Sequence, residues 1–363
     1  MCVRRCFGAQ RRSLIVHSKG KSQEIAMARL EHRPNPQQSK AVLVSEQDEQ
    51  IIRACLRYQF MTVSDFCAVL GMPTSHSYLR RVLSRLAGGK DQTQGHYLYK
   101  FALPKTRSGN ATLVYVPGYQ SRELLAQWGD AEGMTWNSPA SMQNYSYSYV
   151  YHNLAVSRLA ILATLFCVEH QTYTLAELRL WHEMTGRPPR VSLGAEGEQT
   201  SVSAIPDCWV YLQRAADGRG PGLWFEVDNS TSFRQTFIRR LQARLSLFES
   251  AVYAEYFGTA AVVPCFAILG KSPALAKARL KNLLQWTNDF LVKEGWEEWA
   301  ARLRFAVIDY ELLYEERDQL FTQPLWSVPG STTLLPLLPP SPPTGEPHGH
   351  TTTAAHATHT NHC

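Results

Sequence analysis

This sequence lacks several motifs that would by themselves identify the protein's cellular compartment or its catalytic chemistry. No apolar run approaches the roughly 18 residues of a membrane-spanning helix, and the longest, Leu159–Val168, predicts a buried helix. None of the eight cysteines forms a C-x-x-C pair, which favours reduced thiols in a cytoplasmic protein over a disulfide framework or a zinc site. The pair His182-Glu183 lacks the second histidine of a zinc-protease motif.

Positive charge is concentrated at the front of the chain. The net charge is +6 over 363 residues, but residues 1–44 hold nine Lys and Arg against two acids and residues 45–117 hold nine against five, so the remainder is acidic. A basic front indicates contact with a polyanion, and a solvated basic tail is the alternative. The length predicts about two domains, and the apolar content is sufficient for real cores.

Both ends of the chain lack hydrophobic periodicity. Residues 1–44 are predicted to be a basic disordered tail that contacts phosphates non-specifically; a transit peptide, or translation from Met27, are the alternatives. Residues 329–363 are rich in proline, threonine and histidine and contain no aromatic residue. Such a composition cannot bury a core, so this tail is also predicted to be disordered.

Residues 45–129 have the most readable pattern. Ser45 and Thr62 are typical helix starts, and Gly71 and Gly88-Gly89 are typical ends. Three short helices are therefore expected, followed by two alternating segments that flank a polar loop: 45–56, 62–70, 75–86, 97–103 and 111–116. Three helices and then a basic hairpin predict a winged helix-turn-helix that binds DNA.

In that arrangement the third helix enters the major groove and the hairpin contacts the backbone. The side chains suited to phosphates or base edges on the third helix are Ser77, Arg80, Arg81 and Arg85. Those suited to phosphates on the hairpin are Lys100, Lys105 and Arg107. The alternative is a small helical domain with a charged surface, or a wing that binds protein.

After a predicted linker at residues 130–148, the pattern changes to longer helices and strands. The alternation of Tyr145, Tyr147 and Tyr149 favours a short strand, and a strongly apolar helix is expected at 152–168. Strands and helices then give the order helix, strand, strand, strand, helix, strand across residues 149–328. This order predicts an α/β sandwich around a mixed sheet, so the whole chain combines α/β with α+β organisation.

Three acids lie at the ends of two of these predicted strands. Asp207 begins the strand 204–212, and Glu226 and Asp228 lie at i and i+2 in the strand 223–228, where side chains share a face. Carboxylates that converge repel one another unless a cation compensates them. We therefore expect Asp207, Glu226 and Asp228 to hold Mg²⁺ or Mn²⁺, and the alternative is acids that end strands in solvent.

The predicted helix 233–250 follows directly and is rich in arginine. Arg240 and Arg244 are four residues apart, so they share one face of this helix. His152 and Asn153, near the start of the preceding apolar helix, could approach an active site, although a hydrogen-bonded structural histidine is the more common outcome.

The pair Pro206-Asp207, the triplet Glu226-Val227-Asp228 and the arginine-rich helix together resemble the PD-(D/E)XK nuclease-like fold. With the preceding winged helix, residues 45–310 are similar to the replication-relaxation family of bacterial and plasmid proteins. The resemblance implies that Asp207 and Glu226 are metal-binding catalytic acids. The sequence departs from the family pattern at Asp228, where an active nuclease of this fold has lysine. Arg240 could supply the missing positive charge, but arginine is a poor base.

Three functions follow as expectations. The first is a DNA-binding accessory protein of plasmid or mobile-element replication, mobilisation or relaxation, with double-stranded DNA and other replication or mobilisation proteins as partners. The second is a metal-dependent endonuclease or nickase that uses Asp207, Glu226, Asp228 and Arg240. The third is a winged-helix transcriptional regulator whose second domain senses a ligand or partner.

Overall fold

Helices and β-sheets make up the part of the chain that the computed structural model describes. The described residues are 45–72, 76–88, 97–103, 112–129, 145–194, 200–230, 232–270, 272–309 and 317–338. The predicted basic tail 1–44, most of the predicted linker (130–144) and residues 339–363 lie outside them. Sheets of three, seven and two strands are present in the described part. The prediction of a mixed α/β chain is confirmed.

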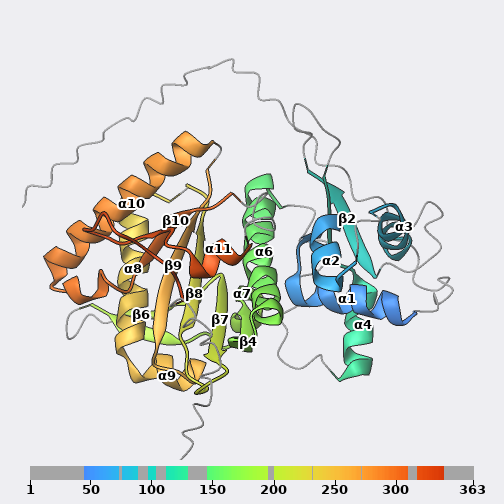
Figure 1. Cartoon of the computed structure of the whole chain (residues 1–363), viewed down its shortest axis with the longest axis horizontal. Coiled ribbons are helices and arrows are strands. Elements are labelled where there is room, and N and C mark those ends of the chain that lie inside the picture. Colours follow the sequence, from blue (N-terminus) through green and yellow to red (C-terminus); the bar gives the residue numbers. More distant parts are fainter. Residues whose placement is uncertain are drawn as a thin grey trace, which may run out of the picture.

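The first part of the chain forms a module of short helices and a three-stranded sheet. Its elements are α1 (Glu46–Tyr58), β1 (Met61–Thr62), α2 (Val63–Leu70), α3 (His76–Leu86), β2 (Leu98–Ala102), β3 (Leu113–Pro117) and α4 (Tyr119–Trp128). The strands are antiparallel in the order β1-β3-β2. We call these elements the N-terminal module. Figure 1 shows it beside the larger sheet, with α3 on the side remote from that sheet.

Side-chain caps explain where the first two helices begin. Ser45 and Asp48 form a reciprocal capping box at the start of α1, and Thr62 and Asp65 form another at the start of α2. Each box satisfies backbone N–H groups that the first helical turn leaves without partners. Gly71 ends α2 in the left-handed conformation, at φ 60°, which a glycine adopts without steric cost.

A seven-stranded mixed sheet forms the second part of the described chain. Its strands are β4 (Tyr173–Leu180), β7 (Cys208–Arg214), β8 (Gly222–Asp228), β9 (Val262–Ile268), β10 (Arg304–Val307), β11 (Trp326–Ser327) and β12 (Leu334–Leu335). They lie in the order β12-β11-β10-β9-β8-β7-β4, with β8, β9 and β10 parallel and the other neighbours antiparallel. The predicted mixed sheet is therefore present.

Helices cover both faces of this sheet. One face packs against α6 (Tyr147–Glu169), and the other packs against α8 (Arg234–Glu249), α9 (Ala251–Phe257) and α10 (Pro273–Glu294) (Figure 1). Alternate residues of β8 enter the two cores: Phe225 lies on the α6 side, and Trp224 lies on the α8 side. Both rings are fully buried, as the two-residue period of a strand covered on both faces requires.

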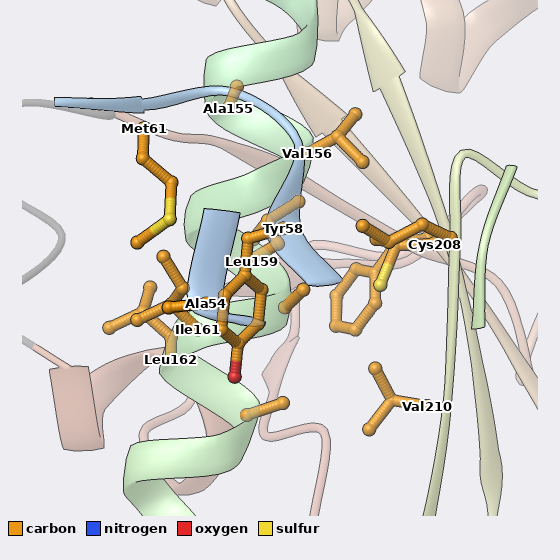
Figure 2. Packing of buried hydrophobic residues seen from close by; sticks show 14 of the residues in the cluster. Ala54, Tyr58, Met61, Ala155, Val156, Leu159, Ile161, Leu162, Cys208 and Val210 are labelled. Carbon is orange, nitrogen blue, oxygen red and sulfur yellow. The ribbon is translucent and has the colours of Figure 1, made fainter. Parts of the chain in front are cut away.

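Helix α6 lies between the N-terminal module and the sheet. In Figure 2, Tyr58 and Met61 of the module approach one side of α6, and Cys208 and Val210 of β7 approach another. This helix is long and apolar enough to cross a membrane, but 72% of its most apolar segment is buried inside the protein. Its apolar composition is accounted for by packing on two sides.

A buried ion pair joins the module to α6. Arg158 donates from Nε to Oδ1 of Asp65 at 2.8 Å, and the two side chains are only 8% and 0% exposed. The other oxygen of Asp65 accepts from the backbone and hydroxyl of Thr62 at 2.6 and 2.7 Å. One carboxylate therefore caps α2 and holds it against α6.

Several element boundaries differ from those predicted. The tyrosine alternation is not a strand, because α6 begins at Tyr147 under a cap from Ser146 and so takes the last two residues of the predicted linker. The predicted loop 186–200 contains the hairpin strands β5 (Arg190–Leu193) and β6 (Thr200–Ser203). Short helices α7 (Trp181–Met184), η1 (Glu297–Trp299) and α11 (Arg317–Thr322) complete the described elements.

The predicted C-terminal disordered tail begins too early. Residues 329–338 are described, and they include β12, which pairs with β11, and Leu338, which is 0% exposed. Both backbone N–H groups of Leu337 and Leu338 donate to the carbonyl of Phe321. The prediction of disorder was wrong here because a local composition rich in proline did not reveal the long-range pairing with β11.

We expect Arg158→Ala to destabilise the protein strongly, because it leaves the Asp65 carboxylate buried without its cation. The expected loss is about 3–5 kcal/mol of the free energy of unfolding, measured by urea denaturation. The control is Arg214→Ala, which breaks the exposed Arg214–Asp217 pair and should cost about 0–1 kcal/mol. Equal small losses in both variants would contradict a structural role for the buried pair.

Candidate functional site

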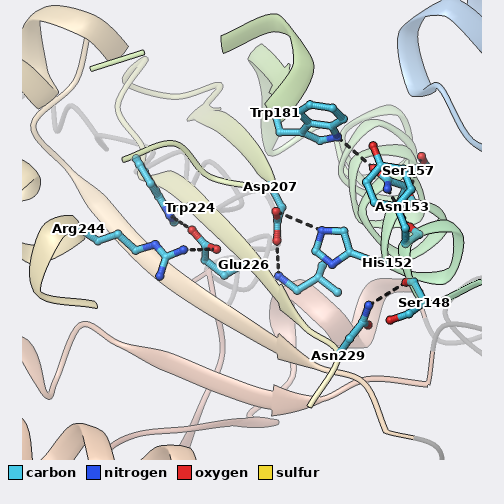
Figure 3. A network of polar contacts seen from close by, with 12 residues as sticks. Ser148, His152, Asn153, Ser157, Trp181, Asp207, Trp224, Glu226, Asn229 and Arg244 are labelled. Atoms are coloured by element: carbon cyan, nitrogen blue, oxygen red, sulfur yellow. Dashed lines mark hydrogen bonds and ion pairs between the residues drawn. The ribbon is translucent and has the colours of Figure 1, made fainter. Parts of the chain in front are cut away.

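A cavity of about 130 Å³ lies where β8 ends, and the predicted acids meet beside it. Strand β7 runs antiparallel to β8, with Cys208 opposite Phe225, so the start of one strand adjoins the end of the other. This pairing places Asp207 next to Glu226, and the backbone N–H of Asp207 donates to the carbonyl of Phe225 at 3.0 Å. Figure 3 shows the polar network that surrounds them.

Asp207 is held by α6 and by the neighbouring strand. One carboxylate oxygen lies 3.2 Å from Nε2 of His152, and the other accepts from the backbone N–H of Val227 at 2.7 Å (Figure 3). Burial alone would raise the pKa of Asp207, but His152, the Val227 N–H and Arg244 lower it below its ordinary value. Burial likewise acts to lower the pKa of His152, but the hydrogen bond and charge of Asp207 raise it.

Glu226 faces α8. Arg244 approaches its Oε2 at 2.5 Å, and the Trp224 indole donates to its Oε1 at 2.7 Å. Both members of the ion pair are nearly buried, at 11% and 12% exposure. Burial raises the pKa of Glu226 to about 7, and Arg244 opposes that rise, while the charge of Asp207 adds to it. This carboxyl group therefore changes protonation near neutral pH.

Asp228 forms a bidentate pair with α10. Arg279 donates from Nε and from an Nη to the two carboxylate oxygens at 2.9 and 2.8 Å, and the Ser230 backbone N–H adds a third bond at 2.8 Å. The guanidinium also lies 5.1 Å from the centre of the Trp286 ring. Such a planar, two-point pair is among the stronger ionic contacts in proteins. Asp228 thus carries a partner cation at the position where the resemblance expects lysine.

Three of the four residues that the sequence predicted for catalysis, Glu226, Asp228 and Arg240, line one cavity. Asp207 adjoins Glu226 through the strand pairing, but its carboxylate contacts His152 of α6 and it is not among the lining residues. Arg240 lines the same cavity as Glu226 and Asp228, one helical turn before Arg244, and its side chain is exposed. Arg279 was missed, because nothing in the sequence links a helix residue 51 positions away to Asp228. His152 and Arg244 were considered, but only the folded chain shows which acid each one contacts.

The predicted metal ligands already have protein partners. Every carboxylate oxygen of Asp207, Glu226 and Asp228 accepts a hydrogen bond or an ion pair. Within the described residues, no group of three or more His, Cys, Asp or Glu side chains is arranged to hold a metal ion. The Mg²⁺ or Mn²⁺ site stays a prediction.

The predicted DNA-binding residues fall into three groups. Ser77, Arg80 and Arg81 are exposed on α3. Arg85 forms an ion pair within the protein, because its guanidinium lies 2.5 Å from the buried Asp48 carboxylate. Lys100 of β2 donates a hydrogen bond to Ser84 at 3.3 Å. Lys105 and Arg107 lie outside the described residues.

Comparisons with protein-family models, with curated proteins and with solved structures found no match to this chain.

The Glu226 carboxyl should titrate with a midpoint near 7, which is measurable from its side-chain ¹³C shift in protein labelled at glutamate. Arg244→Gln should move this midpoint upward, because the lost cation stabilises the ionised form. Arg190→Gln, at an exposed arginine on β5, serves as the control and should leave the midpoint in place. A midpoint in the ordinary glutamate range in the unsubstituted protein would contradict the burial argument.

Proposed function

We propose that this chain is a DNA-binding accessory protein of plasmid or mobile-element replication, mobilisation or relaxation. The observation that carries the proposal is that Ser77, Arg80 and Arg81 of α3 are exposed. Helix α3 itself lies on the side of the module remote from the large sheet (Figure 1). Arginines suit phosphates and guanine edges, and a serine hydroxyl suits either phosphate or base. Nothing in the described residues covers this face.

The arrangement of the N-terminal module supports a winged helix-turn-helix. Three helices precede β2 and β3, and β1 between α1 and α2 adds the third strand. In this kind of domain the third helix reads the major groove, and the hairpin between the last two strands contacts the backbone. Lys105 and Arg107, in the segment that joins β2 to β3, would supply those backbone contacts.

The second part of the chain supports the resemblance to PD-(D/E)XK proteins. The order α6, β4, β7, β8, α8, β9 repeats the helix, strand, strand, strand, helix, strand order, apart from the short α7, β5 and β6 between β4 and β7 and the short α9 between α8 and β9. Asp207 and Glu226, which the resemblance carries over as metal-binding acids, lie next to one another through the pairing of β7 with β8. From this likeness we infer a bacterial, cytoplasmic protein that works with other replication or mobilisation proteins.

The double variant Arg80→Ala/Arg81→Ala should weaken binding to duplex DNA and reduce the dependence of affinity on salt. Each lost phosphate contact is expected to lower the slope of log K against log [salt] by about 1. Arg190→Ala, at an exposed arginine on β5, is the matched control and should retain the original slope. Fluorescence anisotropy with labelled duplex at several salt concentrations measures both quantities; an unchanged slope in the double variant would rule out α3 as the contact.

A metal-dependent endonuclease or nickase is the second candidate. It is favoured by Glu226, Asp228 and Arg240, which line one cavity, and by Asp207, which adjoins Glu226 on the neighbouring strand. In this case the acids hold Mg²⁺ or Mn²⁺, which would activate water and stabilise the leaving oxygen. Because Asp228 stands in place of the expected lysine, another group would have to accept the proton of the attacking water. His152, which contacts Asp207, is the candidate.

Supercoiled plasmid incubated with the protein and Mg²⁺ or Mn²⁺ separates the two candidates. The accessory function predicts retarded but uncut plasmid for the unsubstituted chain, for Asp207→Asn and for Glu226→Gln alike. Conversion to open circles by the unsubstituted chain alone, seen on an agarose gel, would instead establish a nickase and assign catalysis to these acids.

A further inference from the structure

Each of the three acids at or beside the cavity is compensated by a cation from a different helix. Asp207 contacts His152 of α6, Glu226 contacts Arg244 of α8, and Asp228 contacts Arg279 of α10. The three helices approach from both faces of the sheet, so the compensation belongs to the whole fold and not to one local motif. A positive ion entering here would meet carboxylates that are already neutralised.

One cation at the cavity remains without an acid. Arg240 lines the cavity, is exposed, and has no ion-pair partner within the described part of the chain. Ser232 and Asn229 line the same space, and the Asn229 amide donates to the Ser148 carbonyl at 3.1 Å. With the three acids ionised, the local charge is one positive charge in excess when His152 is protonated and zero when it is not; protonation of Glu226 makes it more positive.

We infer that this cavity binds a phosphate group directly through Arg240 and Arg244, without a bridging metal ion. A guanidinium presents its N–H donors in a planar fork that matches phosphate oxygens, and two forks one helical turn apart provide donors from one face of α8. Glu226 holds Arg244 in place at 2.5 Å, so this side chain is already ordered before a ligand arrives.

The nuclease-like part of the chain then acts as a second nucleic-acid contact, which receives a backbone or terminal phosphate while α3 holds the duplex. This step rests on the proposed function, because it takes the phosphate to belong to DNA. The phosphate chemistry itself depends only on the cavity.

Isothermal titration calorimetry of the full chain in EDTA tests the inference with three probes. They are inorganic phosphate, a short single-stranded oligonucleotide, and the same oligonucleotide with a 5′-phosphate. Saturable binding is expected, and Arg240→Ala should weaken it by about tenfold or more, as for the loss of a charged hydrogen-bonding partner. Arg240→Lys should recover part of the affinity, since it restores the charge but not the fork.

Arg239→Ala is the matched control. Arg239 is the neighbouring residue on α8 and is also exposed, but it lines a separate groove against α10 together with Trp286 and Lys293. Its replacement should leave the phosphate affinity unchanged. A preference for the 5′-phosphorylated probe would identify a terminal phosphate as the ligand, whereas equal affinity for both oligonucleotides would identify the backbone.

Three results would overturn the inference: no saturable binding in EDTA, equal affinity in Arg240→Ala and the unsubstituted chain, or binding that requires added Mg²⁺ or Mn²⁺. The last result would restore the metal site predicted from the sequence. The two proposals fail separately, because phosphate titration reports on the cavity alone and the salt dependence of duplex binding reports on α3.

Discussion

The burial of α6 on two sides is the constraint on which the rest of the structure depends. A helix that is apolar almost all round cannot lie on a protein surface, so it needs a cover on each side. The sheet supplies one cover through β7, and the N-terminal module supplies the other through α1 and α2 (Figure 2). Arg158 is the main charged side chain along this buried stretch, and Asp65 compensates it. The position of His152 beside Asp207 follows from the same placement, because the first turns of α6 reach the end of β8.

The cost of burying charge organises the site in the same way. Carboxylates that lose water need a cation or several hydrogen-bond donors, and an ion pair with one partner missing is strongly unfavourable. Glu226 and Asp228 point to the side of the sheet that α8 and α10 cover, and each of these helices brings one arginine to one acid. Arg279 therefore places a positive charge directly against Asp228 at the end of β8.

Short-range pattern predicted much of this fold. The caps at Ser45 and Thr62, the apolar runs of β8 and β9, and the i, i+2 spacing of Glu226 and Asp228 are local signals, and the elements were found close to where they were expected. The features that could not be predicted depend on contacts between residues far apart in the sequence. Strand β12 exists because Leu334 and Leu335 pair with β11, and Arg279 reaches Asp228 from another helix. The alternation of Tyr145, Tyr147 and Tyr149 led to a wrong strand prediction, because the cap at Ser146 begins α6 at Tyr147.

The shared core around α6 has a consequence for how the chain holds together. One continuous apolar cluster contains residues from α1, α2 and α3 as well as from β7, β8 and β9. The gap in pattern near residues 130–148 is therefore a boundary in the sequence but not in the hydrophobic interior. Cutting the chain there would leave α6 with one bare apolar side, and the two halves would associate or aggregate instead of persisting as separate soluble pieces. Any movement between α3 and the cavity must then take the form of bending within a single cooperative unit, not of hinging between two independent bodies.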